Sequence, residues 1–132
     1  MTAQDVLIRT MERQMDSFLR LFAKVPSDKL EWVPQAGVRS ALNQYQEVAT
    51  GITTFWGLYE NRVMAMTPES FGAWQLLQGQ LTTTEALEAH LRADIAKLVA
   101  FIRSASDADL SVPVSIPMPG EFLVVDTFNY PQ

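Results

Sequence analysis

Residues 40–66 read SALNQYQEVATGITTFWGLYENRVMAM and form the longest helical pattern in the chain. Apolar side chains recur in this stretch every three or four residues, the spacing that places them along one face of an α-helix. They are Tyr45, Val48, Ile52, Phe55, Tyr59, Val63 and Met66. The hydroxyl of Ser40 can cap the helix by accepting from the amide of Asn43. Gly51 and Gly57 are costly inside a helix, so they indicate close packing or a local bend.

A helix is also predicted on either side of this stretch. The first covers about residues 2–25, where Thr2 and Asp5 suit an N-terminal cap and Pro26 ends the pattern. The other covers about residues 82–106 and begins with Thr-Thr-Thr-Glu. The first threonine and the glutamate of that sequence are predicted to form a capping box.

The remaining segments are predicted to be connectors or extended chain. Residues 26–39 are expected to be ordered, because apolar anchors lie among their turn residues: Leu30, Trp32 and Val38. Residues 67–70 break the long helix, and residues 71–81 form a connector with at most one short turn of helix. Prolines alternate with apolar residues in an extended segment near residues 112–125. Residues 121–130 either return as a strand or open another helix.

The fold class that these elements predict is all-α, with one helical-bundle domain over residues 1–132. Three amphipathic helices pack on one another through their apolar stripes. Three such stripes leave one face uncovered unless a fourth element covers it, so we expect either the C-terminal tail or a second copy of the chain there. A homodimer is therefore predicted.

Composition narrows the classes of function. Ten Lys and Arg residues against fifteen Asp and Glu give a net charge of −5, so no basic surface for nucleic acid is expected. The chain has no cysteine, which excludes disulfides and thiolate chemistry. Its single histidine, His90, excludes any site that needs two imidazoles from this chain. No signal peptide and no membrane-spanning stretch is recognisable, so the expected location is the cytoplasm.

The connector carries a resemblance to a known family. The sequence KLEWVP at residues 29–34, followed by GVRS at residues 37–40, resembles the connector of DinB-like (damage-inducible) proteins. In that family a Leu-x-Trp-x-Pro segment precedes a Gly-x-Arg-Ser start to the second helix. The order of helices and the proline-rich piece are also similar, so the resemblance spans essentially the whole chain. It implies an up-down four-helix bundle whose fourth helix is truncated or incomplete in this chain.

The resemblance also implies a site. Many DinB-like proteins hold a divalent metal with three histidines, and some act as thiol transferases or hydrolase-like enzymes. The ligand position of their second helix falls on Glu47 here, and a carboxylate can also coordinate such an ion. The two other ligands would lie beyond Gln132, since the chain ends before the helix that bears them. Zinc or nickel is thus expected only if ligands come from outside this chain.

Each candidate residue also has a simpler structural interpretation. Glu47 falls among polar residues at near-helical spacing, which is typical of a solvated face: Asn43, Thr50, Thr54 and Asn61. The alternative is that this face lines a polar cleft. His90 could act as a general base, but it is more simply a boundary histidine among the solvent charges Glu88, Arg92 and Asp94.

Six aromatic residues form core and connector anchors or, alternatively, line a small-molecule pocket: Trp32, Phe55, Trp56, Tyr59, Phe71 and Trp74. Two classes of function remain open. One is a DinB-like metal-dependent enzyme completed by residues from outside the chain. The other is a non-catalytic dimerising module that binds a small apolar ligand.

Overall fold

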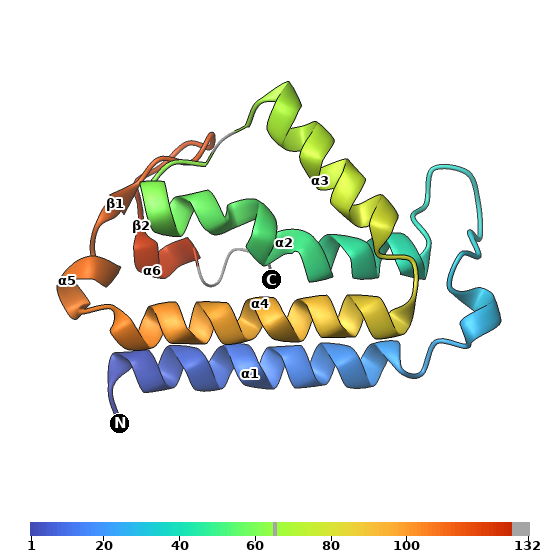
Figure 1. The fold of residues 1–132 in the computed structure, drawn as a ribbon, viewed down its shortest axis with the longest axis horizontal. Coiled ribbons are helices and arrows are strands. Elements are labelled where there is room, and N and C mark those ends of the chain that lie inside the picture. The colour runs from blue at the N-terminus through green and yellow to red at the C-terminus, as the bar shows by residue number, and fades with distance from the viewer. Residues whose placement is uncertain (65, 128–132) are drawn as a thin grey trace.

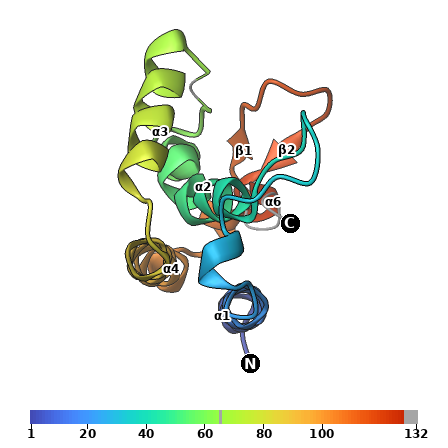
Figure 2. The same cartoon turned by 90° about the vertical axis from the view of Figure 1, so that its right-hand side faces the viewer.

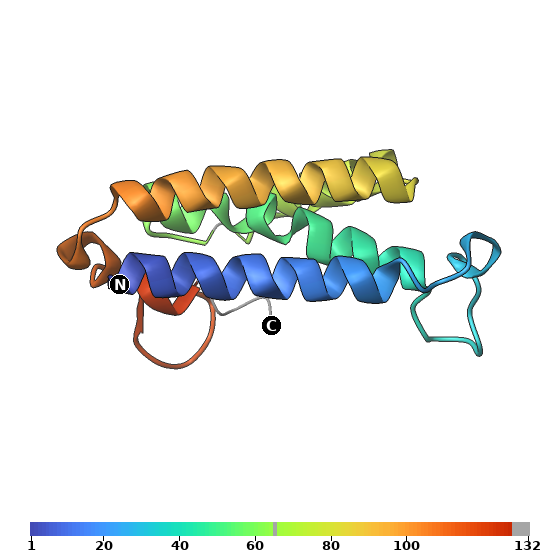
Figure 3. The same cartoon turned by 90° about the horizontal axis from the view of Figure 1, so that it is seen from below.

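Three long helices make up the body of the protein, for which a computed structural model describes residues 1–64 and 66–127. They are α1 (Ala3–Phe22), α2 (Ala41–Asn61) and α4 (Thr84–Ser104). α4 packs against both α1 and α2, and it lies beside α1 along most of its length (Figures 1 and 3). Seen end-on, the three helices stand at the corners of a triangle (Figure 2). The prediction that the chain is mostly helical, with its long helices packed together, is confirmed.

Side-chain caps fix where these helices begin. At α1 the Thr2 hydroxyl accepts from the Asp5 amide at 3.1 Å, and the Asp5 carboxylate accepts from the Thr2 amide at 2.9 Å. The Ser40 hydroxyl accepts from the Asn43 amide at 3.1 Å, as predicted. The predicted box at α4 is wrong, because Thr83 caps this helix one residue later and no glutamate lies at the reciprocal position.

Residues 71–81 are not a connector, and this is the largest correction to the sequence-based prediction. They belong to α3 (Pro68–Gln80), a helix of 13 residues. Pro68 lies in the first helical turn, where its missing amide costs nothing, and Thr67 and Ser70 cap each other. The apolar side chains of α3 are spread around the helix rather than gathered in a stripe, so periodicity did not reveal it.

The predicted end of α2 at Met66 is also wrong, because the helix ends at Asn61. Arg62 follows in the left-handed conformation, with φ of 62°, and turns the chain away from the helix axis. Val63 then forms an isolated parallel bridge with Ser115, and the Ser115 amide donates to the Arg62 carbonyl at 2.8 Å. The end of α2 is thereby tied to the C-terminal part of the chain.

The C-terminal part contains α5 (Asp107–Leu110), β1 (Pro113–Val114), β2 (Phe122–Leu123) and α6 (Val124–Thr127). The two strands form an antiparallel hairpin, so the predicted extended segment is confirmed for residues 113–114 and 122–123, whereas residues 124–125 begin α6. The two alternatives for residues 121–130 both occur, since a strand leads directly into a helix. α6 has four residues and its Val124 is fully buried, while residues 128–132 lie outside the described part.

The connector of residues 26–39 lies at the opposite end of the bundle from this hairpin (Figures 1 and 3). It begins with a short 3₁₀ helix, Ser27–Lys29, and the Leu30 carbonyl accepts from the Leu42 amide at 2.8 Å. Leu30 packs against the core as predicted. Trp32 does not, since it is 60% exposed, and Val38 is exposed as well. Backbone hydrogen bonding, rather than these two side chains, holds the connector to α2.

The apolar core has two parts along the bundle. The part near the connector is built around Tyr45 of α2, whose ring meets Phe22 of α1 edge-on at a centroid distance of 4.3 Å. The other part lies toward the hairpin, where α6 covers the end of α2 and Tyr59 is almost fully buried. Within the described residues, none of the helices combines the length and the apolar character needed to cross a bilayer.

Candidate functional site

α3 leans against α2 and encloses with it a cavity of about 460 Å³, which we call the α2–α3 wedge. Among the long elements α3 packs chiefly on α2, and it rises away from the triangle of the other helices (Figure 2). The wedge is lined by side chains of α2, of α3 and of the segment between them: Glu47, Gly51, Thr54, Phe55, Met64, Met66, Thr67, Pro68, Ser70, Phe71 and Trp74.

Buried polar side chains of α2 hold α3 in place. Thr50 is fully buried, donates its hydroxyl to the Gln46 carbonyl at 2.7 Å and accepts from the indole nitrogen of Trp74 at 2.9 Å. The Gln46 amide nitrogen donates to the carbonyls of Gln78 and Leu81 at 2.9 and 3.0 Å. These carbonyls lie at the C-terminal end of α3, where helical partners run out. Gln46 thus anchors that end of the helix, and Thr50 holds its middle through Trp74.

The walls of the wedge are largely apolar. Phe71 and Trp74 of α3 pack together with ring centroids 5.6 Å apart, and Phe55 faces them from α2. Met64 and Met66 add flexible, polarisable side chains, which adapt to ligands of different shape. Phe71 is half exposed and Met66 is exposed. The wedge therefore opens to solvent past apolar residues.

Glu47 lies at the edge of this wedge with its side chain 47% exposed, and its carboxylate contacts the guanidinium of Arg39. Within the described ranges, no group of three or more potential metal-ligating residues lies together. The interpretation of this face as solvated is wrong for Thr50, which α3 buries, whereas Thr54 lines the wedge. The assignment of Glu47 as a metal ligand stays a prediction.

His90 links two helices rather than standing among solvent charges. Its Nε2 lies 2.9 Å from the Thr53 hydroxyl of α2 and 3.3 Å from the Asp94 carboxylate, and the Thr53 hydroxyl also donates to Asp94. Glu88 and Arg92 instead pair with each other at 2.9 Å. In a Ser-His-Asp triad the carboxylate and the hydroxyl lie at different ring nitrogens, whereas here both lie at Nε2, so this cluster does not have the triad arrangement. Its contacts join α2 to α4.

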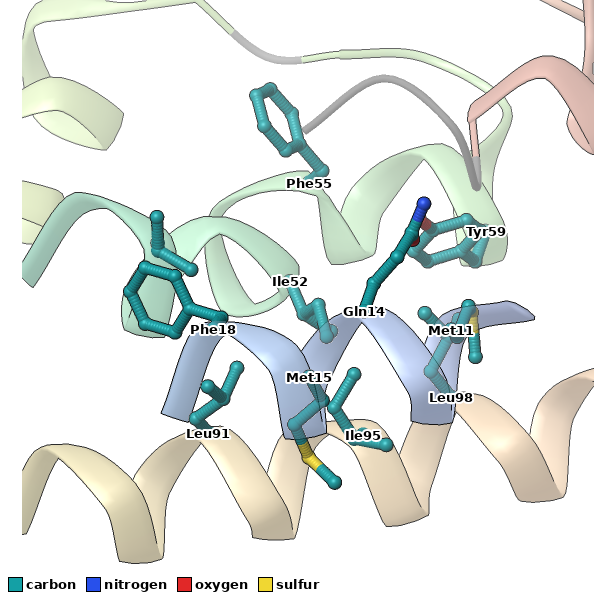
Figure 4. A pocket seen from close by; sticks show the side chains of 11 residues that line it. Met11, Gln14, Met15, Phe18, Ile52, Phe55, Tyr59, Leu91, Ile95 and Leu98 are labelled. Atoms are coloured by element: carbon teal, nitrogen blue, oxygen red, sulfur yellow. The ribbon is translucent and has the colours of Figure 1, made fainter. Parts of the chain in front are cut away.

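A second cavity of about 320 Å³ lies between α1, α2 and α4, and we call it the bundle groove. Figure 4 shows Met11, Met15 and Phe18 of α1 facing Ile52 of α2 and three apolar residues of α4. The α4 residues are Leu91, Ile95 and Leu98. Several of its lining residues are buried, among them Ile52, Leu91 and Leu98. The uncovered face that the three apolar stripes predicted stays a prediction.

The six aromatic residues divide between these environments. Phe55, Phe71 and Trp74 line the wedge. Tyr59 is a core residue, although it also borders the bundle groove, and Trp56 packs against it with a centroid distance of 5.3 Å. Phe55 also packs against the buried core, and Trp74 hydrogen-bonds to the buried Thr50, so both act as anchors as well. The interpretation as an anchor is wrong for Trp32, which is 60% exposed. The interpretation of these residues as the lining of a small-molecule pocket stays a prediction.

Comparison of the chain with known protein families, curated proteins and solved structures finds no match. The resemblance to DinB-like proteins, which is based on the connector sequence and on the order of the elements, stays a prediction.

Proposed function

We propose that this chain is a non-catalytic helical module that binds a small apolar molecule in the α2–α3 wedge. The observation that supports it is the wedge itself, whose volume of about 460 Å³ falls within the range of about 300–1,000 Å³ that is typical of ligand sites. Its aromatic and methionine walls provide apolar contact area, and its few polar groups lie among them. Glu47, the acidic group of the wedge, is already engaged by Arg39, which fits binding better than proton transfer.

Gly51 offers a direct test because it lines the wedge and a side chain added there meets no atom within 4 Å. Gly51→Leu fills the cavity and should also raise the stability of α2 by about 0.5–1 kcal/mol. The neutral dye Nile red, which fluoresces in apolar surroundings, reports binding. We expect the wild-type chain to bind the dye. Gly51→Leu should lose most of this binding and keep the helix content of the wild type.

Gly79→Leu is the matched control, since Gly79 also lies in a helix with open space beside it but does not line the wedge. This control should bind the dye as the wild type does. Unchanged binding by Gly51→Leu would contradict the proposal, and so would an equal loss in both variants.

Homodimerisation is a second proposed function, favoured by the apolar lining of the bundle groove. A two-fold interface places the same surface of both copies in contact, so one pairing would cover both grooves. Light scattering at micromolar concentration should show a dimer. Met15→Lys, which places a charge in the groove, should give a monomer, whereas the exposed Glu12→Lys on the same helix should not. A wild-type monomer would contradict this proposal.

A further inference from the structure

Two features of the α2–α3 wedge indicate the class of its ligand: the charge of its lining and the side-chain donors that are already hydrogen-bonded within the protein. We infer that the wedge takes an aromatic or aliphatic molecule bearing a cationic amine or quaternary ammonium group, with the cation beside Glu47 and the apolar body among Phe55, Phe71 and Trp74. This inference rests on the proposed function and names its ligand class.

The electrostatic evidence begins with Glu47. Among the described residues that line the wedge, it is the only one with a charged side chain. The chain as a whole carries a net charge of −5, so its field attracts cations and repels anions. A half-exposed carboxylate at the edge of an apolar cavity lets a ligand leave its charged group close to water while its apolar part is buried.

Three side-chain donors that line the wedge are already used, which argues against an anionic ligand. A carboxylate or phosphate needs N–H or O–H groups to replace its hydration. The hydroxyl of Thr54 already donates to the Thr50 carbonyl at 2.9 Å, and the indole nitrogen of Trp74 donates to the Thr50 hydroxyl at 2.9 Å. The Ser70 hydroxyl donates to the Thr67 carbonyl within the cap of α3. These three donors are therefore already used, by one bond within α2, one within the cap of α3 and one between the two helices.

The aromatic walls favour a cation for a separate reason. The face of an aromatic ring attracts a cation placed within about 6 Å of its centre. This chain already makes one such contact elsewhere, since the Lys97 ammonium lies 3.8 Å from the centre of the Trp56 ring. In the wedge, the rings of Phe71 and Trp74 lie at an angle of 56° to each other.

Arg39 occupies the carboxylate when no ligand is present. It comes from the connector rather than from a helix, and its side chain is 61% exposed. Exposed ion pairs contribute little net free energy, because water solvates both partners well when they separate. A ligand ammonium can therefore replace Arg39 at Glu47 at little cost and gain apolar contacts that Arg39 does not make.

Three ligands that share a naphthalene ring separate the effect of charge on binding from that of apolar contact. They are the cation (2-naphthylmethyl)trimethylammonium, the neutral alcohol 2-naphthylmethanol and the anion 2-naphthoate. Titration calorimetry at low salt measures the affinity of the protein for each ligand. We expect the cation to bind about two- to five-fold more tightly than the alcohol, a gain typical of a cation at a partly exposed site, and 2-naphthoate to bind most weakly. Glu47→Gln should remove the advantage of the cation and leave the affinity for 2-naphthylmethanol unchanged. Arg39→Gln should tighten binding of the cation, because the internal competitor is gone.

Glu12→Gln is the control for net charge, because Glu12 is an exposed residue of α1 outside the wedge. It should preserve the order of the three affinities. Equal binding of cation and alcohol, or an equal effect of Glu12→Gln and Glu47→Gln, overturns the inference. In that case 2-naphthylmethanol binding that Gly51→Leu abolishes would still support the proposed function. Failure of all three ligands and of Nile red would overturn both.

Discussion

The indole nitrogen of Trp74 donates a 2.9 Å hydrogen bond to the hydroxyl of Thr50. Thr50 is fully buried under α3, although its neighbours in the sequence pattern suggested a solvent-facing position. This hydrogen bond joins the middle of α3 to the middle of α2 and thereby sets how far the two helices stand apart. The width of the wedge depends on it.

Thr50→Val should therefore destabilise the protein and loosen α3. Valine has the shape of threonine but accepts no hydrogen bond, so the indole N–H loses its partner at a cost of about 1–2 kcal/mol. Urea unfolding measures the loss of free energy, and a red shift of tryptophan emission reports solvent reaching Trp74. Thr10→Val is the control, since Thr10 is an exposed threonine on α1. A stability equal to that of the control would contradict this role for Thr50.

Ionisation of the buried phenol of Tyr59 should lower the free energy of unfolding at high pH. Burial raises the pKa of Tyr59 to about 12, and a hydrogen bond with Thr127 partly opposes this rise. The unfolded chain releases the proton near pH 10, whereas the folded chain keeps it until about pH 12. Stability should therefore be intact below pH 10 and fall by about 2–3 kcal/mol as the pH rises to 12.

Tyr59→Phe should remove this share of the pH dependence. Urea midpoints between pH 9 and 12 measure it, and the difference between the variant and the wild type isolates Tyr59. Burial also raises the pKa of Tyr45 to about 12, so part of the fall should remain in Tyr59→Phe. A variant with the same pH profile as the wild type would contradict the assignment.

Thr53→Val should weaken the link between α2 and α4. The variant lacks the hydroxyl that lies between His90 and Asp94, and we expect a loss of about 1 kcal/mol, since the site is partly open to water. A double-mutant cycle with Asp94→Asn measures the coupling of the two side chains. Additive effects of the two substitutions would show that they act independently.

Metal analysis tests the assignment of Glu47 that the DinB-like resemblance implies. A catalytic metal typically takes three protein ligands, whereas Glu47 is half exposed and contacts Arg39. We expect the purified chain, dialysed against zinc or nickel, to keep no stoichiometric metal. Stoichiometric metal that Glu47→Ala abolishes would favour the metal-dependent enzyme over the proposed module.

The long helices could be predicted because local and global signals agree in them. Thr2 and Ser40 are side-chain caps, and an apolar stripe follows each of them. α3 could not be predicted from periodicity, since its apolar residues do not gather on one face. The signal that was present is the Thr-Pro-Glu-Ser sequence at residues 67–70, which is typical of a capped helix start with proline in the first turn.

The site was harder to predict than the fold, because tertiary contacts create it. Phe71 and Trp74 line the wedge only because residues 68–80 are helical. Thr50 and Gln46 have polar side chains that look solvent-facing until α3 covers them. Glu47 was proposed from the DinB-like resemblance, but its contact with Arg39 depends on the path of the connector.

The bridge between Val63 and Ser115 has a consequence for the order in which the chain folds. It closes a loop of about fifty residues that contains α3 and α4, and closing so long a loop costs conformational entropy before any contact repays it. The helices inside the loop form from local interactions. We therefore expect the hairpin end of the molecule to assemble last and, on unfolding, to come apart first.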